Sequence, residues 1–298
     1  FSQFYDQPRY SSGYAALFNT LSFMPETHML KPYSQRVKST YDLMVTMIQQ
    51  AGLNANTLIT LRKNAIENSI NQKKFPLTWK LDTSKYSEIT FKGYEAVMKK
   101  SNATGFPILF YDHNKPFTKQ VKYYDIFTPS NIASAPDSYV IPQGWWAVTD
   151  LLFLNHVSCT RLTHDTLIKV TAYSINNYNS FPKPYEKHHK NYEVTISKAS
   201  IPTQFLKGDY LIKLNQPANR YLVETLDPDG DDGFFACNFF DAILQQKEGY
   251  SEYRWDSLAA KVLERSPSLQ KILEEKKDSD SNFRNNSAAQ LDFIYKNS

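Results

Sequence analysis

Hydrophobic residues near the start of the chain recur at helical spacing in two successive stretches. The first stretch begins after Pro32 and ends at Gly52, which supplies a stop signal. The second stretch can be capped by Asn54 or Thr57. Before both, residues 17–26 are predominantly apolar and run into a proline, so we expect a short strand there and two helices after it. The apolar helical positions are Tyr33, Val37, Tyr41, Met44, Val45 and Ile48, then Leu58, Leu61, Ala65, Ile66 and Ile70.

From Pro76 onward the pattern changes to short β-branched and aromatic segments separated by turn residues. The expected strands are Thr78–Leu81, Glu88–Phe91, Val121–Phe127, Leu167–Tyr173, Tyr192–Ser197 and Tyr210–Leu214, with turns at Asn114–Pro116, Lys207–Asp209 and Asn215–Pro217. Helical spacing returns over 145–155, 218–226 and 257–275. The charged stretch 276–286 is expected to be a flexible loop, and Leu291–Tyr295 is expected to pack back onto the body.

These patterns predict an α+β protein in two parts. Residues 1–75 are expected to be the terminal strand and helices of an α/β domain. Residues 76–298 are expected to form a β-rich α+β accessory domain rather than a doubly wound sheet. The chain opens on Phe1, and we expect it to be the C-terminal part of a larger protein whose signal peptide, if it has one, lies upstream.

Charge and composition narrow the function classes. The net charge is +4 and the positive residues are scattered, whereas nucleic-acid binding calls for a concentrated basic stripe. No apolar stretch reaches 18 residues, so no membrane span is expected. The two cysteines, Cys159 and Cys237, are too few for a tetrahedral thiolate zinc site. They are expected to be free buried thiols, or one disulfide in an oxidising compartment.

Three polar or aromatic clusters have alternative interpretations. Asp227–Gly233 alternates carboxylates like a calcium loop, but its late glycine, and Asn238 in place of a bidentate glutamate, exclude an EF-hand. An irregular calcium site or a solvated turn remain open. His188 and His189 are adjacent and point to opposite faces of a strand, which favours a solvated surface over a metal site. Of Trp145 and Trp146, a possible carbohydrate platform, at least one is expected in the core.

Glu26 is the strongest candidate for chemistry. It follows the apolar run and precedes a loop, a position where catalytic groups lie in mostly parallel sheets. His28 and Lys31 follow closely and add positive charge around it. The alternative is that Glu26 caps the neighbouring helix or forms an ion pair with it.

The run from Tyr10 to Gly52 resembles the end of a carboxypeptidase A-like zinc peptidase. That family presents a tyrosine and a Ser-Gly loop, a strand ending in the catalytic glutamate, and a long terminal helix, in the order seen here. Residues 26–32 (Glu-Thr-His-Met-Leu-Lys-Pro) resemble the large, multi-domain Bacteroidetes-type members. Their C-terminal regions also look similar to Tyr139–Trp146, Lys207–Tyr210, Asn215–Arg220 and Asp232–Asp241. The resemblance thus spans nearly the whole chain, of which about the first fifty residues belong to the catalytic fold.

The resemblance implies a zinc metallocarboxypeptidase that hydrolyses C-terminal residues of peptide substrates. Glu26 matches the family's general base and acid. Tyr10 matches the tyrosine that closes over the substrate, with Tyr14 as a rival, and the residue lining the side-chain pocket falls at Ala15 or Ala16. The parent protein is expected to be secreted or periplasmic.

The family's zinc ligands, a His-x-x-Glu pair and a distant histidine, lie upstream of the tyrosine loop. None of the six histidines here has a glutamate three residues later, so this chain alone is expected to bind neither catalytic zinc nor peptide. The alternative function is a non-catalytic binding or structural module of a degenerate peptidase. The upstream sequence distinguishes the two, because only the enzyme needs the His-x-x-Glu pair.

Overall fold

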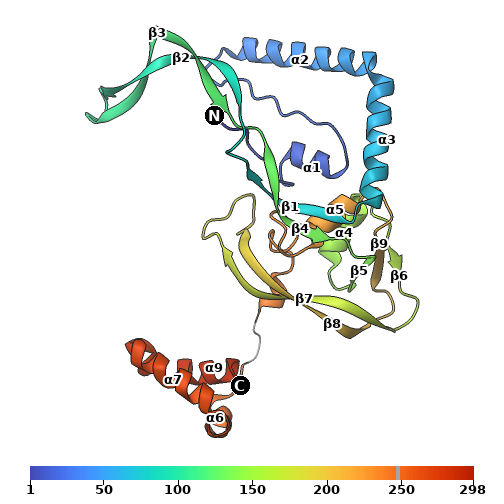
Figure 1. Cartoon of the computed structure of the whole chain (residues 1–298), viewed down its shortest axis with the longest axis vertical. Coiled ribbons are helices and arrows are strands. Elements are labelled where there is room, and N and C mark those ends of the chain that lie inside the picture. The colour runs from blue at the N-terminus through green and yellow to red at the C-terminus, as the bar shows by residue number, and fades with distance from the viewer. Residues whose placement is uncertain (246–248) are drawn as a thin grey trace. The chain divides into compact units, whose positions relative to one another are not determined.

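The computed structural model describes residues 1–245 and 249–298, and these fall into two units, Phe1–Asp241 and Ala242–Ser298 (Figure 1). Small antiparallel sheets and helices make up the fold, which confirms the expected α+β class. The division between units differs from the boundary expected near residue 76. Strand β1 (Lys74–Leu81) crosses that position and pairs with β4 (Phe127–Ser134), so the chain on both sides of it belongs to one sheet.

The first unit has five helices, of which the last four form where the hydrophobic pattern predicts a helix and the first was not predicted. They are α1 (Ser11–Leu17), α2 (Tyr33–Leu53), α3 (Ala55–Asn71), α4 (Trp146–Leu154) and α5 (Asn219–Leu226). The helices expected after Pro32 and after Asn54 are confirmed as α2 and α3. Asn54 occupies the N-cap position of α3, but its side chain instead donates to the Gln50 carbonyl at 2.8 Å.

The strands of the first unit pair as three two-stranded ladders and one three-stranded sheet. The strands not yet named are β2 (Ser87–Lys100), β3 (Pro107–Tyr123), β5 (Ser138–Ile141), β6 (Thr160–Arg161), β7 (Thr166–Ser180), β8 (Asn191–Phe205) and β9 (Tyr210–Lys213). The ladders are β1–β4, β2–β3 and β7–β8, and the larger sheet has the order β5–β9–β6. All of these pairings are antiparallel.

The main core of the first unit gathers side chains from both ends of its sequence. Leu17 of α1 lies in the same buried cluster as Leu152 of α4, Ile212 of β9 and Leu222 of α5. A second cluster holds Phe75, Leu77, Ala133 and Val223. Helix α5 contributes to both clusters through adjacent residues. It therefore joins the N-terminal segment to the strands that follow residue 76.

The strand expected over 17–26 is wrong. Helix α1 continues to Leu17, and the residues from Thr20 to Met29 lie outside helix and strand. The apolar side chains of this segment are largely exposed, with Leu21 at 74% and Phe23 at 68%. A strand needs a neighbour for its backbone hydrogen bonds, and none of the described strands pairs with this segment.

The second unit is a small helical domain with its own core. Its helices are α6 (Glu252–Arg265), α7 (Pro267–Ser279), α8 (Ser281–Arg284) and α9 (Ser287–Lys296), and a 3-10 helix, η1 (Asp241–Leu244), precedes them. The buried residues are Ala259, Leu269, Leu273, Phe283 and Ile294. The flexible loop expected over 276–286 is wrong, because α7 continues to Ser279 and α8 covers Ser281–Arg284. Residues 291–295, expected to pack back onto the body, instead lie within α9 and pack onto the core of this second unit.

Across residues 1–245 and 249–298, no helix combines the length and the apolar character that crossing a bilayer requires.

Candidate functional site

Helix α1 contains Tyr14 and Ala16, two of the four residues that the sequence assigned to the site, and Tyr10 is its N-cap residue. The helix is held in place at both ends. Gly13 approaches the chain so closely that an added Cβ would lie 2.1 Å from the Gln7 carbonyl oxygen. At the other end, Arg220 donates from Nη1 to the Ala16 carbonyl at 2.9 Å, and this carbonyl also accepts from the backbone N–H of Asn19 at 3.2 Å. The Tyr14 hydroxyl donates to Oδ1 of Asn155.

Tyr10 occupies the N-cap position of α1 and lines a pocket of about 410 Å³. The pocket is rich in cations and aromatic rings, which come from the N-terminal segment and from the β7–β8 hairpin. Its lining residues are Gln7, Arg9, Tyr10, Phe181, Lys183, Tyr185, His188 and Lys190. Tyr14 and Ala16 point elsewhere: Tyr14 contacts α4 through Asn155, and Ala16 lines a separate pocket beside α3.

Glu26 lies exposed in the segment between α1 and α2. Its carboxylate makes no hydrogen bond or ion pair with the described residues, so the alternative role as a partner of the neighbouring helix receives no support. The adjacent Thr27 accepts a hydrogen bond of 3.4 Å from Nε of Arg36 on α2. Among the described residues, no hydrogen bond, ion pair or pocket joins Glu26 to Tyr10, Tyr14 or Ala16. The structure therefore places Tyr10, Tyr14 and Ala16 on or beside α1 but directed to different surroundings, and it leaves Glu26 apart from all three.

A buried ion-pair cluster next to Tyr10 was not predicted from the sequence. Arg9 donates to Asp232 from Nε at 2.8 Å and from its backbone N–H at 2.7 Å, and its Nη2 also contacts this carboxylate. Lys190 lies 3.1 Å from Asp231 and 3.6 Å from Asp232. The Asp232 side chain is 0% exposed and that of Arg9 is 16% exposed. The cluster fixes the chain just before α1 against a loop more than two hundred residues later.

These contacts change the interpretation of the Asp227–Gly233 loop. Asp231 and Asp232 already bind cationic side chains, and Gln7 donates to Asp231 as well. No group of three or more histidine, cysteine or carboxylate side chains in residues 1–245 and 249–298 could hold a metal ion. The solvated turn is also wrong, because Asp227 and Asp232 are buried. In the sequence, the density of carboxylates over 227–232 was the one feature that could have indicated these ion pairs.

Asp227 and Asp229 form a second buried carboxylate group at the end of α5. Burial, and then the neighbouring Asp229, raise the pKa of Asp227 to about 7. Burial also acts to raise the pKa of Asp229, but hydrogen bonds from Asp227 and from Asn131, the latter at 3.1 Å, lower it overall. Asp227 therefore keeps its proton up to about pH 7, whereas Asp229 is ionised there.

The Asp227 proton makes the stability of the first unit depend on pH. An unfolded aspartate has a pKa near ~3.9, so between about pH 4 and about pH 7 the folded state holds a proton that the unfolded state has lost. This contribution to the free energy of unfolding is present below that window and is lost as pH rises through it. Asparagine at 227 keeps an N–H donor for Asp229 and cannot ionise.

We therefore expect the Asp227→Asn variant to gain stability relative to the unmodified chain as pH rises from about 5 to about 8. Urea unfolding midpoints, followed by tryptophan fluorescence in a Trp255→Phe background that restricts the signal to the first unit, measure the difference across this range. A difference that stays constant with pH would show that Asp227 does not hold the proton.

The remaining candidate clusters have structural roles. His189 makes a 2.9 Å hydrogen bond with the Phe181 carbonyl, and His188 stacks on Phe239. Trp145 packs edge-on against Phe240 at 5.0 Å, which confirms that one indole of the pair lies in the core, while Trp146 is exposed. Cys159 and Cys237 are free thiols.

Comparison of the chain with protein-family models, with curated proteins and with solved structures finds no match. Function is therefore inferred from the residues and contacts described above.

Proposed function

We propose that residues 1–75 are the closing segment of the catalytic domain of a zinc-dependent metallocarboxypeptidase, which removes C-terminal residues from peptides. The observation that carries this proposal is the apolar surface on both sides of Glu26. Leu21, Phe23 and Met24 before it, and Met29 and Leu30 after it, are all exposed. Each lies within five residues of a lone carboxylate.

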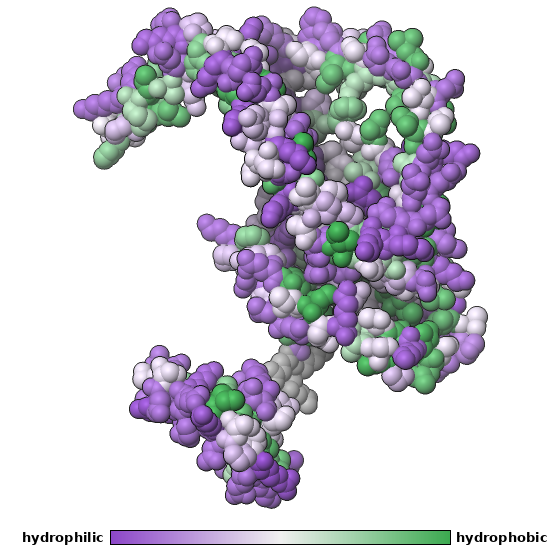
Figure 2. All heavy atoms as spheres, viewed as in Figure 1, coloured by the Kyte–Doolittle hydropathy of each residue, from purple (hydrophilic) through white to green (hydrophobic). Residues whose placement is uncertain are grey.

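An exposed apolar run of this kind calls for a covering partner. Helix α2, which follows, has no buried residue, although Val37, Tyr41 and Met44 lie along it. Figure 2 shows apolar residues at the surface over α2 and α3. Both exposed apolar surfaces support a segment whose covering partner belongs to the rest of a catalytic domain.

The described residues do not fit a zinc site, since no suitable cluster of ligands exists among them. The resemblance assigns the zinc ligands to sequence upstream of Tyr10. The part proposed for this chain is proton transfer: Glu26 accepts a proton from the attacking water and returns it to the leaving amine. Tyr10, or its rival Tyr14, closes over the substrate.

We expect the chain of residues 1–298 to release no amino acid from peptides, and the full-length protein to release C-terminal residues in a chelator-sensitive manner. The assay uses peptides with free and with amidated C-termini, with zinc added, and the zinc content of both proteins is measured. Chelator-sensitive release by residues 1–298 alone would refute the assignment of the ligands. If the full-length protein contains no zinc and releases no amino acid, the proposed carboxypeptidase activity is refuted.

The second candidate is a non-catalytic binding module. A cleft of about 850 Å³ between β5 and the β7–β8 hairpin favours it, because this volume lies within the range of ligand pockets. The two candidates are separated by the same assay, since a binding module predicts no release by the full-length protein.

A further inference from the structure

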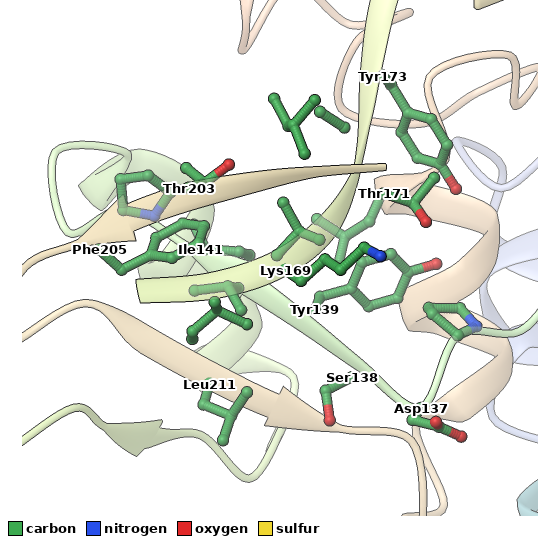
Figure 3. Close-up of a pocket in the computed structure, with 18 of the residues that line it drawn as sticks. Asp137, Ser138, Tyr139, Ile141, Lys169, Thr171, Tyr173, Thr203, Phe205 and Leu211 are labelled. Atoms are coloured by element: carbon green, nitrogen blue, oxygen red, sulfur yellow. The ribbon is translucent and has the colours of Figure 1, made fainter. Parts of the chain in front are cut away.

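The cleft beside β5 is lined mainly by apolar side chains (Figure 3). Ile141 and Trp145 come from β5 and the start of α4, and Phe240 lies on the same side. Ile168 and Phe205 come from the β7–β8 hairpin. These walls would bury apolar groups of a ligand.

Both sides of the cleft also expose the edge of a β-sheet. All four residues of β5 line it, and so do six consecutive residues of β7, Ile168–Tyr173. Successive side chains of a strand point to opposite faces, so consecutive lining residues mean that the main-chain edge itself faces the cleft. By contrast, β8 contributes only alternate residues: Ile201, Thr203 and Phe205.

These edges have free hydrogen-bonding capacity. Strand β5 is the end strand of its sheet, and β7 pairs only with β8. No backbone hydrogen bond among the described residues joins β5 to β7. Exposed edges of this kind accept an added strand.

The polar groups of the cleft indicate the chemistry of its occupant. The Tyr139 hydroxyl and the Thr203 Oγ1 are buried without a hydrogen-bond partner in the described residues. Figure 3 shows Tyr139 and Lys169 in the cleft. Lys169 is exposed and has no ion-pair partner in residues 1–245 and 249–298, whereas the one carboxylate of the lining is Asp137. The unpaired Lys169 ammonium favours a ligand with a carboxylate.

We propose that this cleft binds an extended peptide segment, which adds as a strand between β5 and β7. Its backbone bonds to the two edges, its alternate apolar side chains contact Ile168 and Phe205, and an acidic side chain pairs with Lys169. The six lining residues of β7 match a peptide of about six residues, or ~20 Å of strand. Main-chain hydrogen bonds supply affinity in such strand addition, and side-chain contacts supply selectivity. The inference does not rest on the proposed hydrolysis.

The test measures fluorescence anisotropy of a labelled hexapeptide with residues 1–298. The peptide alternates valine and threonine, carries one central glutamate and is blocked at both ends, so a carboxypeptidase cannot shorten it. We expect saturable binding, and at least about tenfold weaker binding of the same peptide with two N-methylated amides, which removes main-chain donors. We also expect Lys169→Glu to reverse the preference between this peptide and one with lysine in place of glutamate.

Two further variants make the result specific. Val170→Trp fills the cleft and is expected to abolish binding, and Lys80→Glu changes an exposed lysine on β1 and is expected to leave binding unchanged. Circular dichroism and thermal melting check that each variant folds. Equal binding of the N-methylated peptide, or an unchanged charge preference in Lys169→Glu, would overturn the proposal. Absence of peptide binding together with self-association that Val170→Trp abolishes would assign the cleft to a second copy of the chain and also overturn it.

Discussion

Replacing Glu26 by glutamine in the full-length protein is expected to lower peptide turnover by at least ~10²-fold, and up to ~10⁴-fold, with zinc content unchanged. Glutamine keeps the size of the side chain but cannot accept or deliver the proton. Glu26 is exposed and makes no ion pair or hydrogen bond with the described residues, so the change removes no structural contact within this chain. The expected loss therefore falls on kcat.

The matched control is Glu88→Gln, which neutralises an exposed carboxylate on β2 that makes no ion pair with the described residues. Turnover of this variant is expected to match the unmodified enzyme, since isolated surface changes usually alter stability by less than ~0.5 kcal/mol. Steady-state kinetics and metal analysis of both variants measure the effect. Near-normal kcat in Glu26→Gln would mean that Glu26 has only a structural role.

The sequence predicts helices α2 to α5 of the first unit well because their signals are local, whereas α1 was not predicted. Helix α2 begins directly after Pro32, and it ends one residue past Gly52. Helix α5 begins at Asn219, one residue from the expected start. Spacing, proline and glycine act within a few residues of the helix that they define, so no distant contact was needed to place these elements.

The strand expected over 17–26 fails for the opposite reason. An apolar run of this length is compatible with a buried strand or with the end of a helix, and periodicity cannot separate them. Leu17 enters the core as the last residue of α1, beside Leu222. The following residues stay exposed because a strand forms only when a neighbour accepts its hydrogen bonds.

Two turn and loop predictions fail through pairing and capping. The turn expected at Asn114–Pro116 lies inside β3, where the pairing register with β2 shifts between Tyr94 and Glu95. Pro116 lies next to this register shift, and a proline, which has no backbone N–H to donate, is tolerated at such an irregularity in a ladder. In the second unit, Asp280 accepts from the backbone N–H of Phe283 at 3.0 Å and so starts a helix inside a stretch whose charge suggested a loop.

The buried ion-pair cluster could not be predicted from local patterns. Asp232 and Arg9 are 223 residues apart, and neither lies in a segment whose spacing predicts burial. A run of aspartates is equally typical of a calcium loop or a solvated turn. The contact of Asp232 with Arg9, near the other end of the first unit, is what distinguishes an internal ion pair from a calcium loop or a solvated turn.

Replacing Asp232 by asparagine is expected to destabilise the first unit by about 3–5 kcal/mol. The Asp232 side chain is 0% exposed, and the change leaves the half-buried Arg9 and the buried Lys190 without their shared carboxylate. The remaining Asp231 contacts Lys190 but makes no ion pair with Arg9 in the described residues. The cost therefore comes chiefly from an uncompensated charge rather than from the loss of a single hydrogen bond.

The chain has two units, so its unfolding is not a single transition. Trp255 is the tryptophan of the second unit, and a Trp255→Phe background restricts the fluorescence signal to the first. Urea unfolding in that background measures Asp232→Asn against Asp42→Asn, which breaks an exposed pair with Lys38 at 75% and 54% exposure. The control is expected to cost less than about 1 kcal/mol.

Replacing Arg9 by methionine together with Asp232→Asn is expected to recover part of the loss, because no arginine in the cluster then lacks a partner. Equal effects of the two aspartate variants would mean that the cluster is accessible to water and contributes no more than a surface ion pair.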